Sequence, residues 1–211
     1  MISLYTWTTP NGRKVSILLE ELGLAYETNP VHLGRNEQFS AAFLAISPNN
    51  KIPAIVDHAT DGGPLSVFES GAILTYLAET HGRFLPASGA ARYKVLEWLN
   101  WQMGGLGPML GQLFYFEKMA KEKSQQATAR FVAEADRLLT VMDKRLAEST
   151  YLAGEDYTIA DISAYPWIVT AMGFLGDVLG ERLSTKPALR RWMDLVGARP
   201  AVQRGMAVPA L

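Results

Sequence analysis

The sequence predicts an α/β domain with a mixed sheet, followed by an all-helical domain. Within the first eighty residues, short runs rich in β-branched and aromatic residues alternate with helical patterns. After a stretch that contains Gly, Pro and Ser, apolar residues recur only at helical spacing. We therefore expect an α/β domain at residues 1–80, a linker at residues 81–91 and a helical-bundle domain at residues 92–211.

The first domain begins with a strand and a helix. "ISLYTW", at residues 2–7, is rich in residues that favour strands. The segment "PNGRKVSILLEELGL" follows it, and one of its faces is apolar at the i, i+3, i+4, i+7 spacing of a helix. That face consists of Val15, Leu18, Leu19 and Leu22. Gly23 is expected to end the helix, because glycine adopts the left-handed conformation readily.

The rest of the first domain predicts three more strands and two helices. "AYETNPVHL" predicts an edge strand, because Pro30 cannot donate to a ladder, and "EQFSAAFLAIS" predicts a short helical or irregular piece. "PAIVD" and "LSVF" flank the turn-forming "HATDGG" and predict an antiparallel hairpin. "ESGAILTYLAE" then predicts a closing helix. The order βαβαββα is that of a thioredoxin-like domain.

The second domain predicts packed helices. Thr158 and Asp161 have the spacing of a capping box, with Asp in place of the usual Glu. Pro166 falls inside the helix that this box begins and is expected to kink it. The glycine-rich run "MGGLGPMLG", at residues 103–111, lacks the Gly-Lys-Ser/Thr ending of a phosphate loop, so close packing of helices explains it better.

The composition argues against several classes of function. Of the 211 residues, 20 are basic and 21 are acidic, which gives a net charge of −1, so we expect no nucleic-acid partner. No apolar run is long enough to span a bilayer and no N-terminal targeting pattern is present, so we expect a cytoplasmic protein without a membrane partner. His32, His58 and His81 are scattered, and we expect no metal site.

Cysteine is absent from the sequence. A disulfide framework, a thiolate metal site and a catalytic cysteine of the chain's own are therefore impossible. Any thiol chemistry of this protein must use the sulfur of another molecule.

Two junctions between a strand and a helix carry candidate chemistry. In "TTPNGRK", Thr9 fits an N-cap and Pro10 fits the first helical turn, but the free N–H groups and the helix dipole also suit an anion. In "FESGAIL", Glu69 and Ser70 begin a helix. They fit simple capping, or a carboxylate and donors that recognise an α-amino acid end. Capping and ligand binding stay open at both junctions.

A third candidate is the proline in "SPNNKIPAIVD", at residues 47–57. Pro53 cannot donate to a sheet ladder, yet it stands directly before an apolar strand. An X-Pro bond is also the one peptide bond for which the cis form costs little. A cis bond would leave the backbone of Ile52 available to a peptide ligand.

Together, "TPNGRKV", "SPNNKIPAIVD", "FESGAILTYLAE" and "YTIADI" resemble the cytosolic glutathione transferases over essentially the whole chain. "WLNWQMGGLGPMLGQ", at residues 98–112, extends the resemblance to the Nu class. These are bacterial glutathione transferases with disulfide-bond reductase activity, related to the yeast nitrogen-regulator prion protein. The resemblance implies glutathione as a co-substrate, no metal, and a homodimer.

The resemblance also implies roles for the matching residues in binding glutathione. Ile52, beside a cis Pro53, would pair with the cysteinyl backbone of glutathione. Lys51 and Gln38 would lie near its glycyl carboxylate. Glu69 and Ser70 would hold its γ-glutamyl end.

Three residues are implied to be catalytic. Thr9 and Asn11 would face the sulfur, and Arg130, in "ATARFVAE", falls where this class places an arginine over the active site. Thr9 stands where most transferase classes have a tyrosine, serine or cysteine that activates the thiol. Tyr5 and Thr8 stay open as substitutes for that role.

The function expected from this reading is a glutathione-dependent transferase or oxidoreductase that reduces small disulfides with two glutathiones. Conjugation to electrophiles or peroxidase activity would be weaker. Because the chain has no cysteine, any mixed disulfide must form between glutathione and the substrate. Two alternatives stay open: a non-catalytic glutathione-binding regulatory module, and an ordinary conjugating glutathione transferase.

Overall fold

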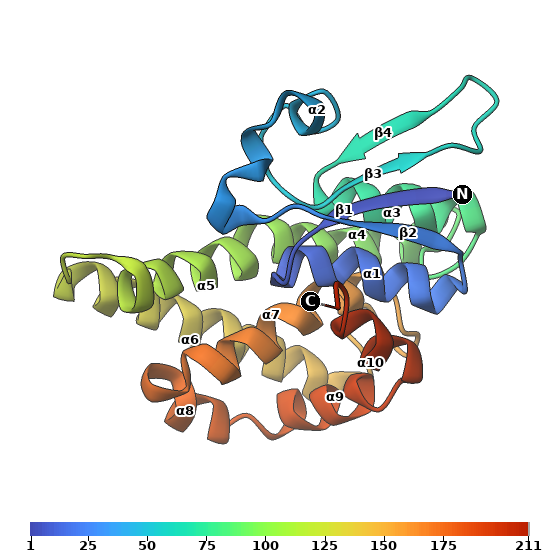
Figure 1. Ribbon diagram of the computed structural model, residues 1–211. Helices are drawn as coiled ribbons and strands as arrows, with labels where there is room; N and C mark the ends of the chain where they lie inside the picture. The colour runs from blue at the N-terminus through green and yellow to red at the C-terminus, as the bar shows by residue number, and fades with distance from the viewer. Residues whose placement is uncertain (211) are drawn as a thin grey trace. The chain divides into compact units, whose positions relative to one another are not determined.

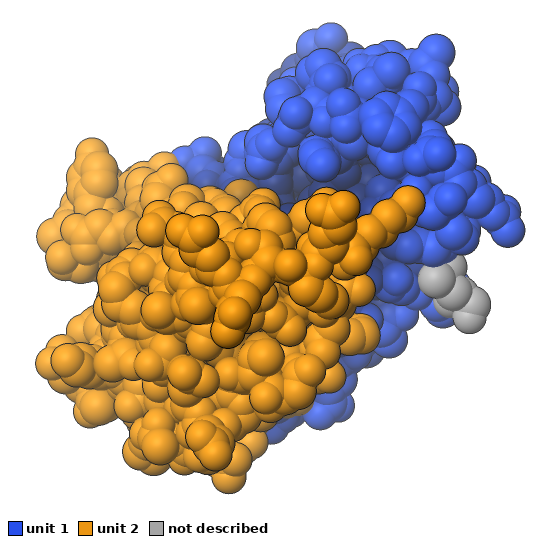
Figure 2. Space-filling view, turned by 90° about the vertical axis from the view of Figure 1, so that its left-hand side faces the viewer, with its two compact units in different colours: residues 1–85, 198–211 blue, residues 86–197 orange. Residues whose placement is uncertain are grey.

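The computed structural model describes residues 1–210. They form two compact units, which Figure 2 shows in different colours. Unit 1 comprises Met1–Leu85 together with the C-terminal segment from Ala198, and unit 2 comprises Pro86–Gly197.

Unit 1 is built on a four-stranded mixed sheet (Figure 1). Its strands are β1 (Ile2–Thr6), β2 (Tyr26–Pro30), β3 (Ala54–Asp57) and β4 (Leu65–Phe68), in the spatial order β2-β1-β3-β4. β1 is parallel to β2 and antiparallel to β3, and β3 is antiparallel to β4. This topology confirms the thioredoxin-like domain predicted from the element order.

Helices α1 (Pro10–Leu22) and α3 (Ser70–His81) pack against each other on one face of this sheet, as Figure 1 shows. The short elements between β2 and β3 are the 3₁₀ turns η1 (Leu33–Arg35) and η2 (Glu37–Phe39) and the single helical turn α2 (Ala41–Leu44). The core of the unit consists mainly of aliphatic side chains from α1, α3 and the central strands. Among those with no exposed surface are Leu4, Val15, Ile17, Leu18, Leu19, Ile55, Ile73, Leu74 and Leu77.

Both ends of α1 follow the sequence prediction. The Thr9 hydroxyl accepts a hydrogen bond from the Gly12 N–H at 3.2 Å, which satisfies one of the free donors of the first turn. Gly23 has φ 69°, and its N–H returns to carbonyls of the last turn. The N-cap and the stop residue are therefore confirmed.

The C-terminal helix α10 (Pro200–Met206) belongs to unit 1, although its sequence follows directly on that of the helical domain. It packs along α1. The Ser16 hydroxyl donates to the Gly205 carbonyl oxygen at 2.7 Å. A Cβ atom at Gly205 would lie 2.5 Å from the Ile17 Cα, so only glycine permits this approach. Arg199 adds two charged hydrogen bonds to Glu21.

Unit 2 is entirely helical (Figure 1). Its elements are α4 (Gly89–Trp101), the π-helical segment η3 (Gln102–Leu106), α5 (Gly107–Phe114), the π-helical segment η4 (Tyr115–Met119), α6 (Gln125–Glu148), α7 (Ile159–Phe174), α8 (Gly176–Ser184) and α9 (Pro187–Gly197). The predicted all-helical second domain is confirmed. Helix α7 continues through Pro166.

The capping box at the start of α7 is also confirmed. Thr158 and Asp161 exchange the two hydrogen bonds of the motif. The Asp161 carboxylate, which is fully buried, also accepts from the Leu152 N–H at 3.0 Å and from the Trp192 indole N–H at 2.9 Å. Asp161 thus holds the loop before α7 and the helix α9 to one point, which is a structural role.

The glycine-rich run at residues 103–111 allows close packing, as predicted. A Cβ atom at Gly107 would lie 2.7 Å from the Gln102 side-chain nitrogen and 3.2 Å from the Trp167 ring. At Gly111 it would lie 3.4 Å from the same ring. Small residues here bring α5 against Trp167 of α7.

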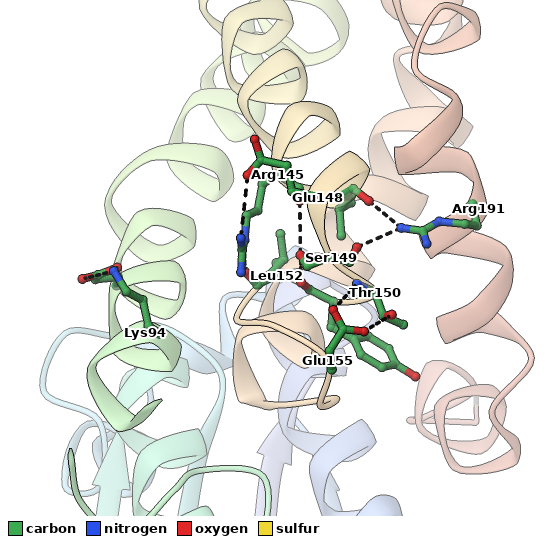
Figure 3. Close-up of polar contacts among 11 residues, drawn as sticks. Lys94, Arg145, Glu148, Ser149, Thr150, Leu152, Glu155 and Arg191 are labelled. Atoms are coloured by element: carbon green, nitrogen blue, oxygen red, sulfur yellow. Dashed lines mark hydrogen bonds and ion pairs between the residues drawn. The ribbon is translucent and has the colours of Figure 1, made fainter. Parts of the chain in front are cut away.

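A polar cluster closes the C-terminal end of α6, as Figure 3 shows. Arg145 donates to the Leu152 carbonyl at 2.8 Å, and the Ser149 hydroxyl donates to the Tyr151 carbonyl at 2.7 Å. Arg191 of α9 donates to the Ser149 carbonyl at 2.9 Å. These donors bind backbone carbonyls of the turn that follows α6, so the cluster is structural.

Two properties of the described residues bear on the expected absence of membrane and metal partners. Over residues 1–210, no single helix has the length and apolar character to cross a membrane. Helices α7 and α8 have both only when taken together, and they are bent by 115° at their junction. The same residues hold no group of three or more His, Asp or Glu side chains that could bind a metal ion.

Candidate functional site

The sheet of unit 1 brings three loops to one of its ends. The register pairs Tyr5 at the end of β1 with Ala54 at the start of β3, and Ala54 with Phe68 at the end of β4. The segments that follow β1, precede β3 and follow β4 therefore begin side by side. These segments contain eight of the ten residues or substitutes proposed from the sequence for glutathione in this unit: Thr8, Thr9, Asn11, Lys51, Ile52, Pro53, Glu69 and Ser70.

The first loop ends at the N-terminus of α1. The Thr9 hydroxyl oxygen accepts the hydrogen bond from the Gly12 N–H through one lone pair. The O–H of Thr9 can therefore still donate to another group. Asn11 lies partly buried in the first turn. Gly12 is needed here, because a Cβ atom at this position would lie 2.6 Å from the Trp7 carbonyl oxygen. The turn therefore presents a hydroxyl, an amide and a positive helix end together.

The hydroxyls of Tyr5 and Thr8 are the two alternatives to Thr9 for activating the thiol. The Tyr5 ring packs against the cluster of buried residues around Val31 and Ile52, with its centroid 6.3 Å from that of Phe43. Thr8 is exposed. Thr9 is the one of the three that caps the helix, which fixes the direction of its hydroxyl.

The second loop, residues 47–53, is held by a buried serine. Ser47 has no exposed surface, and its hydroxyl donates to the Lys51 carbonyl at 2.8 Å. Its N–H donates to the Phe43 carbonyl at 2.8 Å, and its carbonyl accepts from Asn50, which has φ 50°. The turn is therefore closed on itself, while the Lys51 side chain is exposed. The sequence reading did not assign this role to Ser47.

The peptide bond between Ile52 and Pro53 is cis, as the sequence permitted. The Ile52 side chain is 9% exposed and packs in a cluster with Val31, Phe43 and Ala54. Among residues 1–210, neither the N–H nor the C=O of Ile52 pairs with another backbone group. Its side chain is thus anchored while its backbone donor and acceptor are available for a ligand.

The third loop leads into α3 through an unusual residue. Glu69 has φ 72° and ψ 117°, a conformation that non-glycine residues rarely adopt. Glu69 occupies the N-cap position of α3, but its exposed side chain makes no capping hydrogen bond. The Asn49 amide approaches the Glu69 carboxylate at 3.5 Å. Backbone strain of this kind concentrates at functional sites.

Ser70 begins α3 and is 3% exposed. Its hydroxyl lies 3.4 Å from the ammonium nitrogen of Lys14, a residue of α1 that is 1% exposed. Burial lowers the pKa of Lys14 to about 7, and the carboxylate of Glu69 acts in the opposite direction. Lys14 was missed from the sequence. The available signal was its spacing, four residues before Leu18 on the apolar face of α1.

The remaining predicted residues lie elsewhere. Gln38 is in η2, where its side-chain oxygen is buried and has no hydrogen-bond partner among the described residues. Arg130 is exposed on α6 in unit 2. It lines a hollow of about 640 Å³ together with Met109, Phe131, Glu134 and Arg137. The roles of both residues stay predictions.

Two family models match the chain. Residues 1–79 match "Glutathione S-transferase, N-terminal domain", and residues 107–200 match "Glutathione S-transferase, C-terminal domain". The disulfide-bond oxidoreductase YfcG of Escherichia coli (strain K12) is 48% identical over 208 residues, which cover 98% of this chain and 94% of that protein. The disulfide-bond oxidoreductase YghU of the same organism is 43% identical, with coverage of 98% and 74%.

Solved structures agree with these matches. A glutathione transferase family member from Pseudomonas fluorescens pf-5, with two glutathione bound, superposes with a TM-score of 0.94 at 47% identity, covering 99% of this chain and 93% of that chain. Ure2p in complex with glutathione superposes with a TM-score of 0.88 at 29% identity, covering 97% and 92%. The resemblance inferred from the sequence motifs is confirmed: the chain belongs to the glutathione S-transferase family.

Proposed function

We propose that this protein is a glutathione-dependent disulfide-bond oxidoreductase that reduces small disulfides with two molecules of glutathione. The observation that carries the proposal is that three loops with residues predicted to bind glutathione meet at one end of the sheet, in a chain without cysteine. The disulfide-bond oxidoreductases YfcG and YghU, to which the chain is similar, support it. So does the Pseudomonas fluorescens structure with two glutathione bound.

The reaction balances without a protein thiol. The thiolate of one glutathione attacks a sulfur of the substrate disulfide, which forms a mixed disulfide and releases one substrate thiolate. The thiolate of a second glutathione attacks the glutathione sulfur of that mixed disulfide, which forms glutathione disulfide and releases the other substrate thiolate. The two protons lost by the glutathiones are taken up by the two products. Two electrons pass from glutathione to the substrate.

The loops of unit 1 would hold the first glutathione by its backbone and its ends. The N–H and C=O of Ile52 would pair with the cysteinyl residue, as a short piece of antiparallel ladder. The Glu69 carboxylate would accept from the γ-glutamyl ammonium, and Ser70 with the first N–H groups of α3 would bind its α-carboxylate. Lys51 and Gln38 would lie near the glycyl carboxylate.

Thr9 and Asn11 would activate the sulfur. A free thiol has a pKa of about 8.5, so lowering it by two units requires roughly 2.7 kcal/mol. One hydrogen bond to a charged acceptor contributes about 1.5–3 kcal/mol, and a helix N-terminus contributes roughly another 0.3–1. The Thr9 oxygen is the acceptor in its hydrogen bond with the Gly12 N–H, so the Thr9 O–H can donate to the sulfur. These groups can meet the requirement without a tyrosine.

Three further proposals come from the family. Arg130 is proposed as a catalytic residue, and Arg130→Ala should lower turnover more than Arg137→Ala, its neighbour in the same hollow. The protein is proposed to act as a homodimer, which light scattering coupled to size exclusion tests directly. A cytoplasmic location without a metal cofactor completes the proposal.

The decisive experiment compares two turnovers in one preparation. Reduction of hydroxyethyl disulfide by glutathione is followed through oxidation of NADPH by added glutathione reductase. Conjugation of glutathione to chlorodinitrobenzene is followed by absorbance. We expect disulfide reduction to dominate. Conjugation without disulfide reduction would instead identify an ordinary conjugating transferase. Calorimetric binding of glutathione without either turnover would identify a regulatory module.

A further inference from the structure

Lys14 is an unusual residue to find in the interior of unit 1. Lysine is almost never fully buried unless it is paired, and Lys14 is 1% exposed among aliphatic residues of α1 and α3 that have no exposed surface at all. Its ammonium reaches across to α3 and lies 3.4 Å from the hydroxyl of Ser70. The charge therefore sits directly behind the residue that begins α3.

The N-terminus of α3 is already suited to a negative group. Its first turn contains no acidic residue, and the side chain of the preceding Glu69 makes no capping hydrogen bond. The positive end of the helix dipole is thus not neutralised by the helix itself. When it is protonated, the Lys14 side chain behind Ser70 adds a positive charge at the same point, where low dielectric strengthens its field.

Glu69 places a negative charge beside this positive point. Its carboxylate is exposed, and its charge opposes the effect of burial on Lys14. A positive and a negative site next to each other match an α-amino acid zwitterion, which carries a carboxylate and an ammonium on one carbon. The γ-glutamyl end of glutathione has this chemistry.

We propose that Lys14 is a positioning residue that orients the Ser70 hydroxyl and supplies the positive charge by which the site selects the α-carboxylate of the γ-glutamyl group. This inference rests on the proposed function, because it assigns the ligand end bound at Ser70. Lys14 itself does not touch the ligand; it acts through Ser70.

A purely structural lysine would behave differently on replacement. Burial disfavours the charged form of Lys14, so an apolar chain of similar length at this position removes that cost. Lys14→Met should therefore keep or raise the unfolding temperature while it weakens binding. If Lys14 served the fold alone, the same change would lower the unfolding temperature and leave the preference among ligands untouched.

The test compares native protein, Lys14→Met and the control Lys144→Met, an exposed lysine on α6. Calorimetry measures binding of three unreactive ligands: S-methylglutathione, its analogue lacking the α-carboxylate (γ-aminobutyryl in place of γ-glutamyl), and its analogue lacking the ammonium (glutaryl). Lys14→Met should weaken S-methylglutathione and the glutaryl analogue by about 10-fold or more, the range of a charged hydrogen bond. It should leave the analogue without the carboxylate unchanged, and Lys144→Met should match the native protein.

Steady-state kinetics give a second readout. Lys14→Met should raise the KM for glutathione by a similar factor and keep kcat within about twofold, because the chemistry takes place at the sulfur and not at the γ-glutamyl end. Lys14→Gln, which keeps a hydrogen-bond donor but no charge, should weaken binding in the same ligand-dependent way. It also serves if Lys14→Met does not fold.

The outcomes separate the two proposals. If the native protein neither binds S-methylglutathione nor reduces disulfides, the proposed function fails, whatever the variants do. If the native protein does both and Lys14→Met weakens all three ligands equally, or none, the role of Lys14 is overturned and the function stands. If neither Lys14→Met nor Lys14→Gln folds, Lys14 belongs to the fold and the inference is likewise overturned.

Discussion

Lys14→Met should abolish a pH dependence of the free energy of unfolding. Burial lowers the pKa of Lys14 from its ordinary 10.5 to about 7, with Glu69 opposing the shift. Between these two values the unfolded chain binds a proton that the folded chain does not hold. Stability of the native protein must therefore rise as the pH rises from about 7 towards 10.5, and the cost of the buried charge is largest below pH 7.

The size of the effect follows from the same two values. The slope approaches about 1.4 kcal/mol per pH unit within the window, so the native protein should gain about 2 kcal/mol relative to Lys14→Met between pH 7 and pH 9. Solvent does not reduce this figure, because Lys14 is 1% exposed. The pKa values of Tyr26, Tyr76 and Tyr165 are raised, mainly by burial. Those tyrosines lower stability only above about pH 10, outside the measured range.

Urea unfolding followed by tryptophan fluorescence measures the effect at pH 7, 8 and 9. Protein concentration is held fixed, because assembly would contribute to apparent stability. The control Lys144→Met should keep the native slope. Parallel profiles for the native protein and Lys14→Met would refute the reasoning, since they would show that Lys14 does not change its protonation in this range.

Substitutions at three further positions test the site. Asn11→Ala should lower kcat for disulfide reduction by about 10-fold and change the KM for glutathione by no more than about twofold, because the amide acts on the thiolate; an unchanged kcat contradicts its role. Glu69→Gln should weaken glutathione binding by about 10- to 150-fold at constant unfolding temperature. Glu69→Gly should weaken it equally but gain about 1 kcal/mol of stability, because φ 72° suits glycine; equal stability of the two variants argues against strain. Gly12→Ala should cost about 1–3 kcal/mol in urea unfolding, because its Cβ would meet the Trp7 carbonyl at 2.6 Å, whereas the control Gly180→Ala, with open space around it, should cost nothing.

Much of unit 1 could be predicted because its signals are local. The strands follow from short apolar runs, and the ends of α1 follow from Thr9 and Gly23, whose conformational preferences act over a few residues. The hairpin of β3 and β4 follows from the turn residues between them. The meeting of the three loops then follows from topology, because antiparallel neighbours reverse direction at the same end of a sheet.

The features that were missed depend on contacts between distant segments. Helical spacing shows that α10 has an apolar face, but not that this face lies on α1, where Gly205 meets the backbone of Ile17. Ser47 reads as a polar loop residue, and only the closed turn shows its hydroxyl on the Lys51 carbonyl. Glu69 reads as an N-cap, since the sequence does not report a positive φ.

At Lys14, a local signal in the sequence meets a contact between distant segments, α1 and α3. A lysine is expected at the surface because it is charged, whereas its spacing with Leu18 places it on the apolar face of the helix. In the structure Lys14 is buried, as its spacing indicates. A methionine would satisfy the same spacing without the cost of burying a charge, so the apolar pattern of α1 does not by itself require a lysine. In the proposed role, a ligand carboxylate beyond Ser70 would stabilise the charged form of Lys14 and offset part of that cost on binding. Stability and affinity are then coupled through one proton: the protonated lysine that weakens the free protein is the form that binds glutathione best.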